Sequence, residues 1–168
     1  MITQEDLATT EINMRYDLSP IRNIISDLSG LLGNFSDEFI GAFYPKVVSK
    51  KANIVITELV NNAVVNSANG DSRISLEIMI NRSVLRIRVM NAAERSQYRK
   101  VKDHIRRINS ARDLRKLLAD TIRERRKERL RGGLGLIRLA AENKFTLSTR
   151  YRAPYLIVDS QIGLGGLS

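Results

Sequence analysis

The sequence predicts an α+β fold, a two-layer α/β sandwich with a mixed, mostly antiparallel sheet. Two pairs of segments alternate between apolar and polar residues across short turns, which is typical of long β-hairpins. Apolar residues at helical spacing predict two helices before the first hairpin and a short helix before the second. Helices gathered on one face of such a sheet form two layers. The length of 168 residues fits one domain, residues 1–168.

The first elements are a strand and two helices. The strand is expected over Glu11–Tyr16, where apolar and polar residues alternate. The first helix should begin with Ser19 as N-cap and Pro20 at the first helical position, and end at Gly33 and Asn34. A second long helix over residues 45–68 follows a connector with four aromatic residues, Phe35, Phe39, Phe43 and Tyr44.

The two hairpins and the short helix follow from turn chemistry and alternation. The first hairpin pairs Arg73–Ile80 with Val84–Met90, and the second pairs Phe145–Tyr151 with Tyr155–Asp159. The glycine cluster at 132–135 opens a short helix that ends near residue 142, and the glycine-rich residues 163–168 are expected to be a flexible tail.

Residues 94–131 form a basic helical insert. They contain 15 Lys/Arg and 6 Asp/Glu, a net charge of +9 of the +10 carried by the whole chain. Two helices are expected, over about residues 96–108 and 112–131, with a break at Asn109 or Ser110. Three interpretations stay open: a solvated face, a lid whose arginines bind phosphates, and a docking face for an acidic protein. Nucleic-acid binding ranks last because Tyr98 is the one aromatic residue there to stack on bases.

Composition excludes several classes of site. The chain has no cysteine and a single histidine, His104, so thiolate chemistry and a multi-histidine metal centre are excluded. His104 is expected to be a surface residue. Neither a secretory signal nor a membrane-spanning run of about 20 apolar residues is present, so a cytoplasmic location without membrane contact is expected.

A polar stripe runs along the second helix. Glu58, Asn62 and Asn66 are four residues apart and therefore share one face of it. A carboxylate and two amides offer hard oxygen ligands for a hydrated Mg²⁺ that bridges phosphates, and the carboxylate could orient an attacking hydroxyl group. The alternative is that the three residues are only the solvated side of an amphipathic helix.

The glycine cluster Gly132, Gly133 and Gly135 is the second motif. Glycines at a helix start let backbone N–H groups approach phosphate oxygens closely. On its own such a cluster is more often just a turn.

Together the two motifs resemble the GHKL (Bergerat) ATPases, which include histidine-kinase catalytic domains, gyrase-type ATPases and anti-sigma-factor kinases. The resemblance spans residues 47–159, with Glu58 to Ala63 similar to the family's N-box and Gly132 to Leu136 similar to its second glycine box. It implies a Bergerat-type fold, ATP and Mg²⁺ as cofactors, Glu58 as the catalytic carboxylate and Asn62 as the magnesium ligand. The glycine residues would close over the phosphates.

The first glycine box of that family departs from its pattern here. Asn91 stands where the family has an aspartate that binds the adenine amino group, and alanines replace the glycines that follow. An amide carbonyl can still accept that hydrogen bond, without the added strength of a charged acceptor.

Within the superfamily the chain most resembles SiaB-type bacterial regulators, which also have an asparagine in the first box and a helical insert. The motifs carrying this resemblance are Asn91 with its alanines, a turn at residues 106–110 and the leucines of 114–118. It implies a Ser/Thr protein kinase that phosphorylates a small SiaC-like (STAS) partner protein. A nucleotide-free protein-binding regulator of the same fold is the alternative, a basic nucleic-acid-associated protein is the third, and a homodimer stays open.

Overall fold

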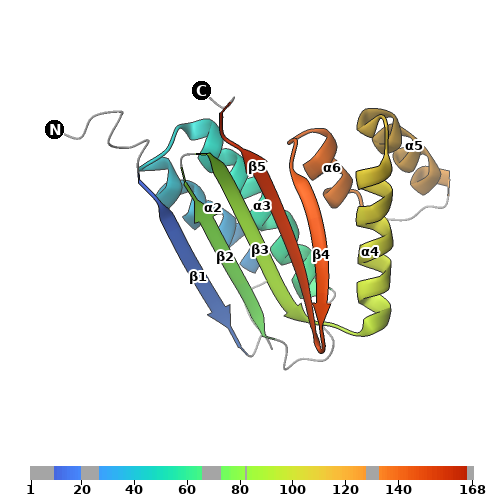
Figure 1. Cartoon of the computed structure of the whole chain (residues 1–168), viewed down its shortest axis with the longest axis horizontal. Helices are drawn as coiled ribbons and strands as arrows, with labels where there is room; N and C mark the ends of the chain where they lie inside the picture. Colours follow the sequence, from blue (N-terminus) through green and yellow to red (C-terminus); the bar gives the residue numbers. More distant parts are fainter. Residues whose placement is uncertain (1–9, 20–26, 66–72, 82, 128–132, 166–168) are drawn as a thin grey trace.

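The computed structural model describes residues 10–19, 27–65, 73–81, 83–127 and 133–165. Five strands form one sheet in the order β1-β2-β3-β5-β4 (Figure 1). The strand bounds are β1 Ile12–Leu18, β2 Ile74–Ile80, β3 Val84–Ala92, β4 Thr146–Arg152 and β5 Tyr155–Gly163. All four strand pairings are antiparallel, so the expectation of a mixed sheet is wrong, whereas the α+β class and the two hairpins are confirmed.

The sheet is apolar on the face that the helices cover. Alternate residues of β2 and β3 point into the core and are at most 2% exposed: Ile74, Leu76, Ile78, Ile80, Leu85, Ile87 and Val89. Burial of such side chains contributes about 1.5–3 kcal/mol each, which explains why the alternation in the sequence predicts these strands well. Helix α3 (Lys46–Val65) packs against β2 and β3, and α2 (Leu28–Gly41) packs against α3 (Figure 1).

Helix α2 differs from the sequence prediction at its C-terminal end. Its N-cap is Asp27, whose Oδ1 accepts a hydrogen bond from the backbone N–H of Gly30 at 2.9 Å, and the predicted start at Ser19 and Pro20 lies at and beyond the edge of the described residues. The helix continues through Gly33 and Asn34 to Gly41, so the predicted stop is wrong.

Helix α2 continues past Gly33 because this glycine packs closely against α3. A Cβ atom on Gly33 would overlap Thr57 Oγ1 and lie 3.2 Å from the backbone oxygen of Asn53, so this glycine lets α2 approach α3. Phe35 and Phe39 of the predicted aromatic connector lie within α2, and Phe43 and Tyr44 follow its end. The rings of Phe35, Phe39 and Phe43 contact in series.

The basic insert forms two helices, α4 (Arg95–Ser110) and α5 (Leu114–Lys127). The break lies at residues 111–113 and not at Asn109 or Ser110, which are helical. Helix α4 lies along β4, at the opposite edge of the sheet from β1 (Figure 1). The rings of Tyr98 and Tyr151 stack at 5.2 Å, and Asn109 Nδ2 donates to the Leu147 carbonyl at 3.0 Å. Aromatic stacking and a hydrogen bond from a side chain of α4 to the backbone of β4 therefore hold the insert against the sheet.

Helix α6 (Gly135–Ala141) follows the glycine cluster and packs against α3, α4 and α5. The second hairpin is longer than predicted, since β5 extends to Gly163, so the prediction of a tail that starts at residue 163 is wrong there because Gly163 pairs with Val84 of β3. Residues 166–168 lie outside the described residues.

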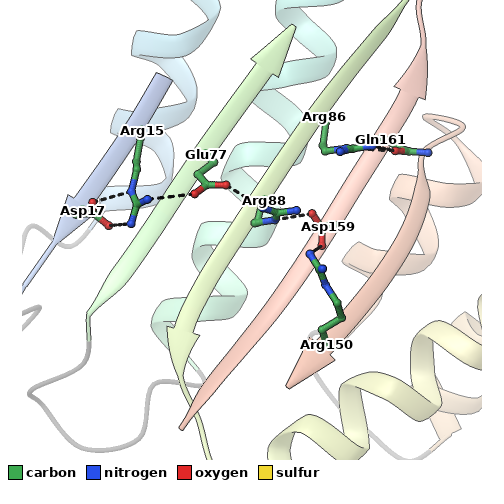
Figure 2. A network of polar contacts seen from close by, with 8 residues as sticks. All are labelled: Arg15, Asp17, Glu77, Arg86, Arg88, Arg150, Asp159 and Gln161. Carbon is green, nitrogen blue, oxygen red and sulfur yellow. Dashed lines mark hydrogen bonds and ion pairs between the residues drawn. The ribbon is translucent and has the colours of Figure 1, made fainter. Parts of the chain in front are cut away.

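A ladder of charges crosses the other face of the sheet (Figure 2). Arg88 on β3 lies at its centre, 3.1 Å from Glu77 Oε2 and 2.7 Å from Asp159 Oδ1. Arg150 on β4 pairs with Asp159 on β5 at 3.0 Å, and Arg15 on β1 pairs with Glu77 on β2 at 3.5 Å. These ion pairs suit a face without a helical cover, because cross-strand pairs of opposite charge stabilise an antiparallel sheet. Among the described residues, no helix is long and apolar enough to cross a membrane.

Candidate functional site

A central cavity of about 310 Å³ opens between α3, the insert and the glycine turn before α6. This volume is at the lower end of the roughly 300–1,000 Å³ of small-molecule sites. The lining combines apolar side chains with a smaller number of polar and charged ones, as in such sites generally. The apolar residues are Leu59, Ala63, Val89, Val101, Leu136, Leu156 and Val158, and the polar or charged residues are Glu58, Asn62, Asn91, Lys100, His104 and Arg125.

Five of the seven residues singled out from the sequence line this one cavity: Glu58, Asn62, Asn91, Gly133 and Gly135. They come from α3, from β3 and from the turn before α6, which are separated by up to 77 positions in the chain, from 58 to 135. The other two, Asn66 and Gly132, lie outside the described residues. The polar stripe of α3 and the glycine turn therefore face the same space.

Glu58 and Asn62 form a hydrogen-bonded pair on α3. The Asn62 side-chain amide donates to Glu58 Oε1 at 2.8 Å, across one helical turn. This hydrogen bond orients the side chains of Glu58 and Asn62, and both line the cavity. These are hard oxygen donors of the kind that Mg²⁺ accepts.

The donor set fits a hydrated magnesium ion held mainly by phosphates. Within the described part of the chain, no group of three or more His, Cys, Asp or Glu side chains could hold a metal by itself. Magnesium is usually bound by one or two protein oxygens together with substrate phosphates and water, so a single amide or carboxylate is sufficient from the protein side.

The two glycines of the turn are both in contact with charged side chains. A Cβ on Gly135 would overlap the carboxylate of Glu58, and a Cβ on Gly133 would overlap the guanidinium of Arg125. Gly133 also has a φ of +75°, in the left-handed region that favours glycine. From the sequence we expect these glycines to let phosphate oxygens approach the backbone. In the structure, the side chains of Glu58 and Arg125 lie against them.

A second hollow of about 790 Å³ adjoins the central cavity. Glu58, Asn62, Gly133 and Gly135 line both spaces. The carboxylate of Glu58 therefore forms part of the wall between them.

Asn91 lies on β3, opposite Leu156 of β5, and is 3% exposed. Its Nδ2 donates to the Ala92 carbonyl at 3.0 Å. This bond directs the amide, and the side chain lines the cavity at the end of an apolar strand. A buried amide here can recognise a polar edge of a ligand.

Sequence reasoning missed the cationic side of the cavity. Lys100 and His104, one turn apart on α4, and Arg125 on α5 all line it. The prediction that His104 is a surface residue is wrong: the side chain is half-buried, and burial lowers its pKa, with the charges of Arg125 and Arg107 acting in the same direction. The amphipathic pattern of α4, which buries Ile105 and Ile108, is the signal that could have placed His104 on the inner side.

Comparison with known proteins gives a fold and no family. No protein-family model and no curated protein sequence matches the chain. Among solved structures, a chain in the crystal structure of the SiaB–SiaC complex from Pseudomonas aeruginosa is similar, with a TM-score of 0.64 and 16% identity over 89% of each chain. At that identity the similarity concerns the fold: the chain has the fold of a protein found in the SiaB–SiaC complex.

Proposed function

We propose that this protein is a signalling regulator that binds a magnesium nucleotide in the central cavity and acts on a small partner protein. The observation that carries the proposal is the meeting of Glu58, Asn62, Asn91, Gly133 and Gly135 around one cavity of about 310 Å³. Two separate sequence motifs with the same implied ligand come together there, and the fold is shared with a protein of the SiaB–SiaC complex.

In this proposal each residue has a distinct role. The side-chain carbonyl of Asn91 accepts a hydrogen bond from the amino group of adenine, and the apolar part of the cavity lining receives the ring. Asn62 offers an oxygen to magnesium, which neutralises phosphate charge when bound. Glu58 orients the hydroxyl group of the acceptor, as a carboxylate within hydrogen-bond reach of a nucleophile does. The transfer of a phosphoryl group then depends mainly on positioning and on charge stabilisation.

The proposed partner is a small SiaC-like protein of the STAS type, phosphorylated on a serine or threonine. Support comes from the fold match, since the similar chain was crystallised in a complex with a protein partner. The kinase assignment is tested by incubating the protein with a candidate partner and labelled ATP, with Glu58→Gln as the inactive control.

A nucleotide-free regulator is the second candidate, and one observation favours it. The Glu58 carboxylate lies directly against Gly135 and the Arg125 guanidinium directly against Gly133, where a bound phosphate would approach. A protein that keeps this arrangement would control its partner by stoichiometric capture. No change in thermal stability on adding ATP, ADP or Mg²⁺ is the result this candidate predicts.

Isothermal titration with Mg-ATP tests the leading proposal. The wild-type protein should bind, and Asn62→Ala should bind at least about tenfold more weakly, because it removes both an oxygen ligand and the hydrogen bond that fixes Glu58. Asn13→Ala is the matched control, since Asn13 is exposed on β1 away from the cavity lining. Equal affinity of wild type and Asn62→Ala would contradict the proposed site.

A further inference from the structure

The charged side chains of the insert differ in their surroundings. Arg106 pairs with Asp103 at 2.9 Å, Arg107 with Glu124 at 3.6 Å and Arg123 with Asp120 at 3.6 Å. Within the described part of the chain, Lys100 and Arg125 form no ion pair with a carboxylate. These two are the cations of the insert that line the central cavity. Exposed cations of the insert such as Arg99 and Arg126 also have no ion pair among the described residues, so what distinguishes Lys100 and Arg125 is their place in the cavity lining.

Arg125 is held in that position by packing. Its neighbours Arg123, Glu124, Arg126 and Lys127 are exposed, whereas Arg125 is half-buried with its guanidinium against Gly133. The position requires the absence of a Cβ at residue 133. An arginine held half-buried without a carboxylate has lost part of its hydration, and an anion in the cavity would compensate for this loss.

Helix α4, which carries Lys100 and His104, is also held in place. Lys100 and His104 project from one face of α4, which is fastened to β4 by the stacking of Tyr98 on Tyr151. Glu58, from α3, is the one acidic residue of the described lining. The insert therefore supplies the cationic part of the lining and α3 the anionic part.

We propose that Lys100, His104 and Arg125 form an anion-binding wall, supplied by the insert, that contacts the phosphate groups of the nucleotide. This inference rests on the proposed function and adds the residues that would select a triphosphate over an uncharged nucleoside. Arg125 offers a planar pair of donors to phosphate oxygens, and Lys100 adds a point charge.

Binding should also protonate His104. In the free protein burial lowers the pKa of His104, and the charges of Arg125 and Arg107 act in the same direction, while Lys100 one turn away and Glu58 also line the cavity. Phosphate oxygens at this wall would offset the arginine charges and raise the pKa of His104. Near neutral pH the complex should therefore take up a fraction of a proton that the free protein does not hold.

Three probes separate this inference from the proposed function: Mg-ATP, adenosine and inorganic tripolyphosphate. Arg125→Gln and Lys100→Gln should each weaken Mg-ATP and tripolyphosphate binding about tenfold or more and leave adenosine binding unchanged. Arg126→Gln and Arg99→Gln are the matched controls, because each lies next to a tested residue in the chain and is absent from the cavity lining.

The outcomes are distinct. If wild type binds Mg-ATP and Arg125→Gln weakens it no more than Arg126→Gln does, the wall is wrong and the proposed function stands. If wild type binds tripolyphosphate through Arg125 and does not bind adenosine, the wall stands and the nucleotide assignment fails. Binding of none of the probes overturns both.

Proton uptake gives an independent readout. Titration of Mg-ATP in two buffers of different ionisation enthalpy should show uptake by the wild type and none by His104→Gln. Equal uptake by both proteins would remove His104 from the wall.

Discussion

At the scale of single residues, the contact between Glu58 and Gly135 links the two motifs. The carboxylate lies on the backbone of the glycine turn and at the same time accepts the amide of Asn62. Any side chain at position 135 must displace this carboxylate. Because the carboxylate is the flexible end of a long side chain, displacement costs little stability and moves the group that the proposed chemistry uses.

Gly135→Ala should therefore separate binding from stability. We expect the free energy of unfolding to change by less than about 1 kcal/mol, since alanine also favours the helix that begins there. The affinity for Mg-ATP should fall about tenfold or more. Chemical denaturation and calorimetric titration of the same samples measure the two effects.

The control for this variant is Gly41→Ala. Its new Cβ would lie 3.4 Å from Ser49 Oγ, an ordinary contact, so both stability and affinity should stay near wild type. Retained affinity in Gly135→Ala would show that the position of Glu58 is unimportant for binding.

At the scale of elements, a buried carboxylate joins α2 to α3. Asp37 accepts hydrogen bonds from Ser49 Oγ at 2.6 Å and from Lys50 Nζ at 2.7 Å, and Lys46 Nζ lies at 3.3 Å. These partners, Lys50 first, lower the pKa of Asp37 to about 2. The residue therefore supports the position of α3, the helix that carries Glu58 and Asn62.

The sign of the pH dependence follows from that lowered pKa. The ionised carboxylate stabilises the folded state above about pH 4, where the unfolded chain is also ionised, and the contribution is lost as the pH falls towards 2. Asp37→Asn should cost about 1–2 kcal/mol at neutral pH, a value reduced for the exposure of both lysines.

Denaturation of wild type and Asp37→Asn at several pH values between 2 and 7 measures this. The stability difference should shrink steadily below about pH 4. A difference that stays constant over this range would mean that the carboxylate acts through its shape and not through its charge.

At the scale of the whole molecule, the sequence predicts those parts of the structure that local patterns determine. Alternation in β2 and β3 gives the hairpin, and the spacing of Glu58 and Asn62 gives a shared helical face. The role of Gly33 could not be predicted from the local sequence, because this glycine lets α2 contact Thr57 on α3 and does not end α2. Tertiary packing outweighs the usual terminating tendency of glycine there.

The sequence predicts only part of the candidate site for the same reason, because tertiary packing cannot be read from local patterns. Its motif residues could be found because each motif is contiguous, and the insert cations could not, because many similar charges stand side by side in residues 94–131. Only the way α4 and α5 pack distinguishes Lys100 and Arg125, which line the cavity, from the charged residues that face solvent. Whether a charge serves solubility or binding is therefore decided by the fold.

The most direct test of the account is a crystal structure of the protein with Mg²⁺ and a non-hydrolysable ATP analogue. The account predicts the purine beside Asn91, magnesium at Asn62, and the phosphates between Gly133 and Arg125. An analogue bound elsewhere, or one whose phosphates contact neither Gly133 nor Arg125 at saturating concentration, would contradict it.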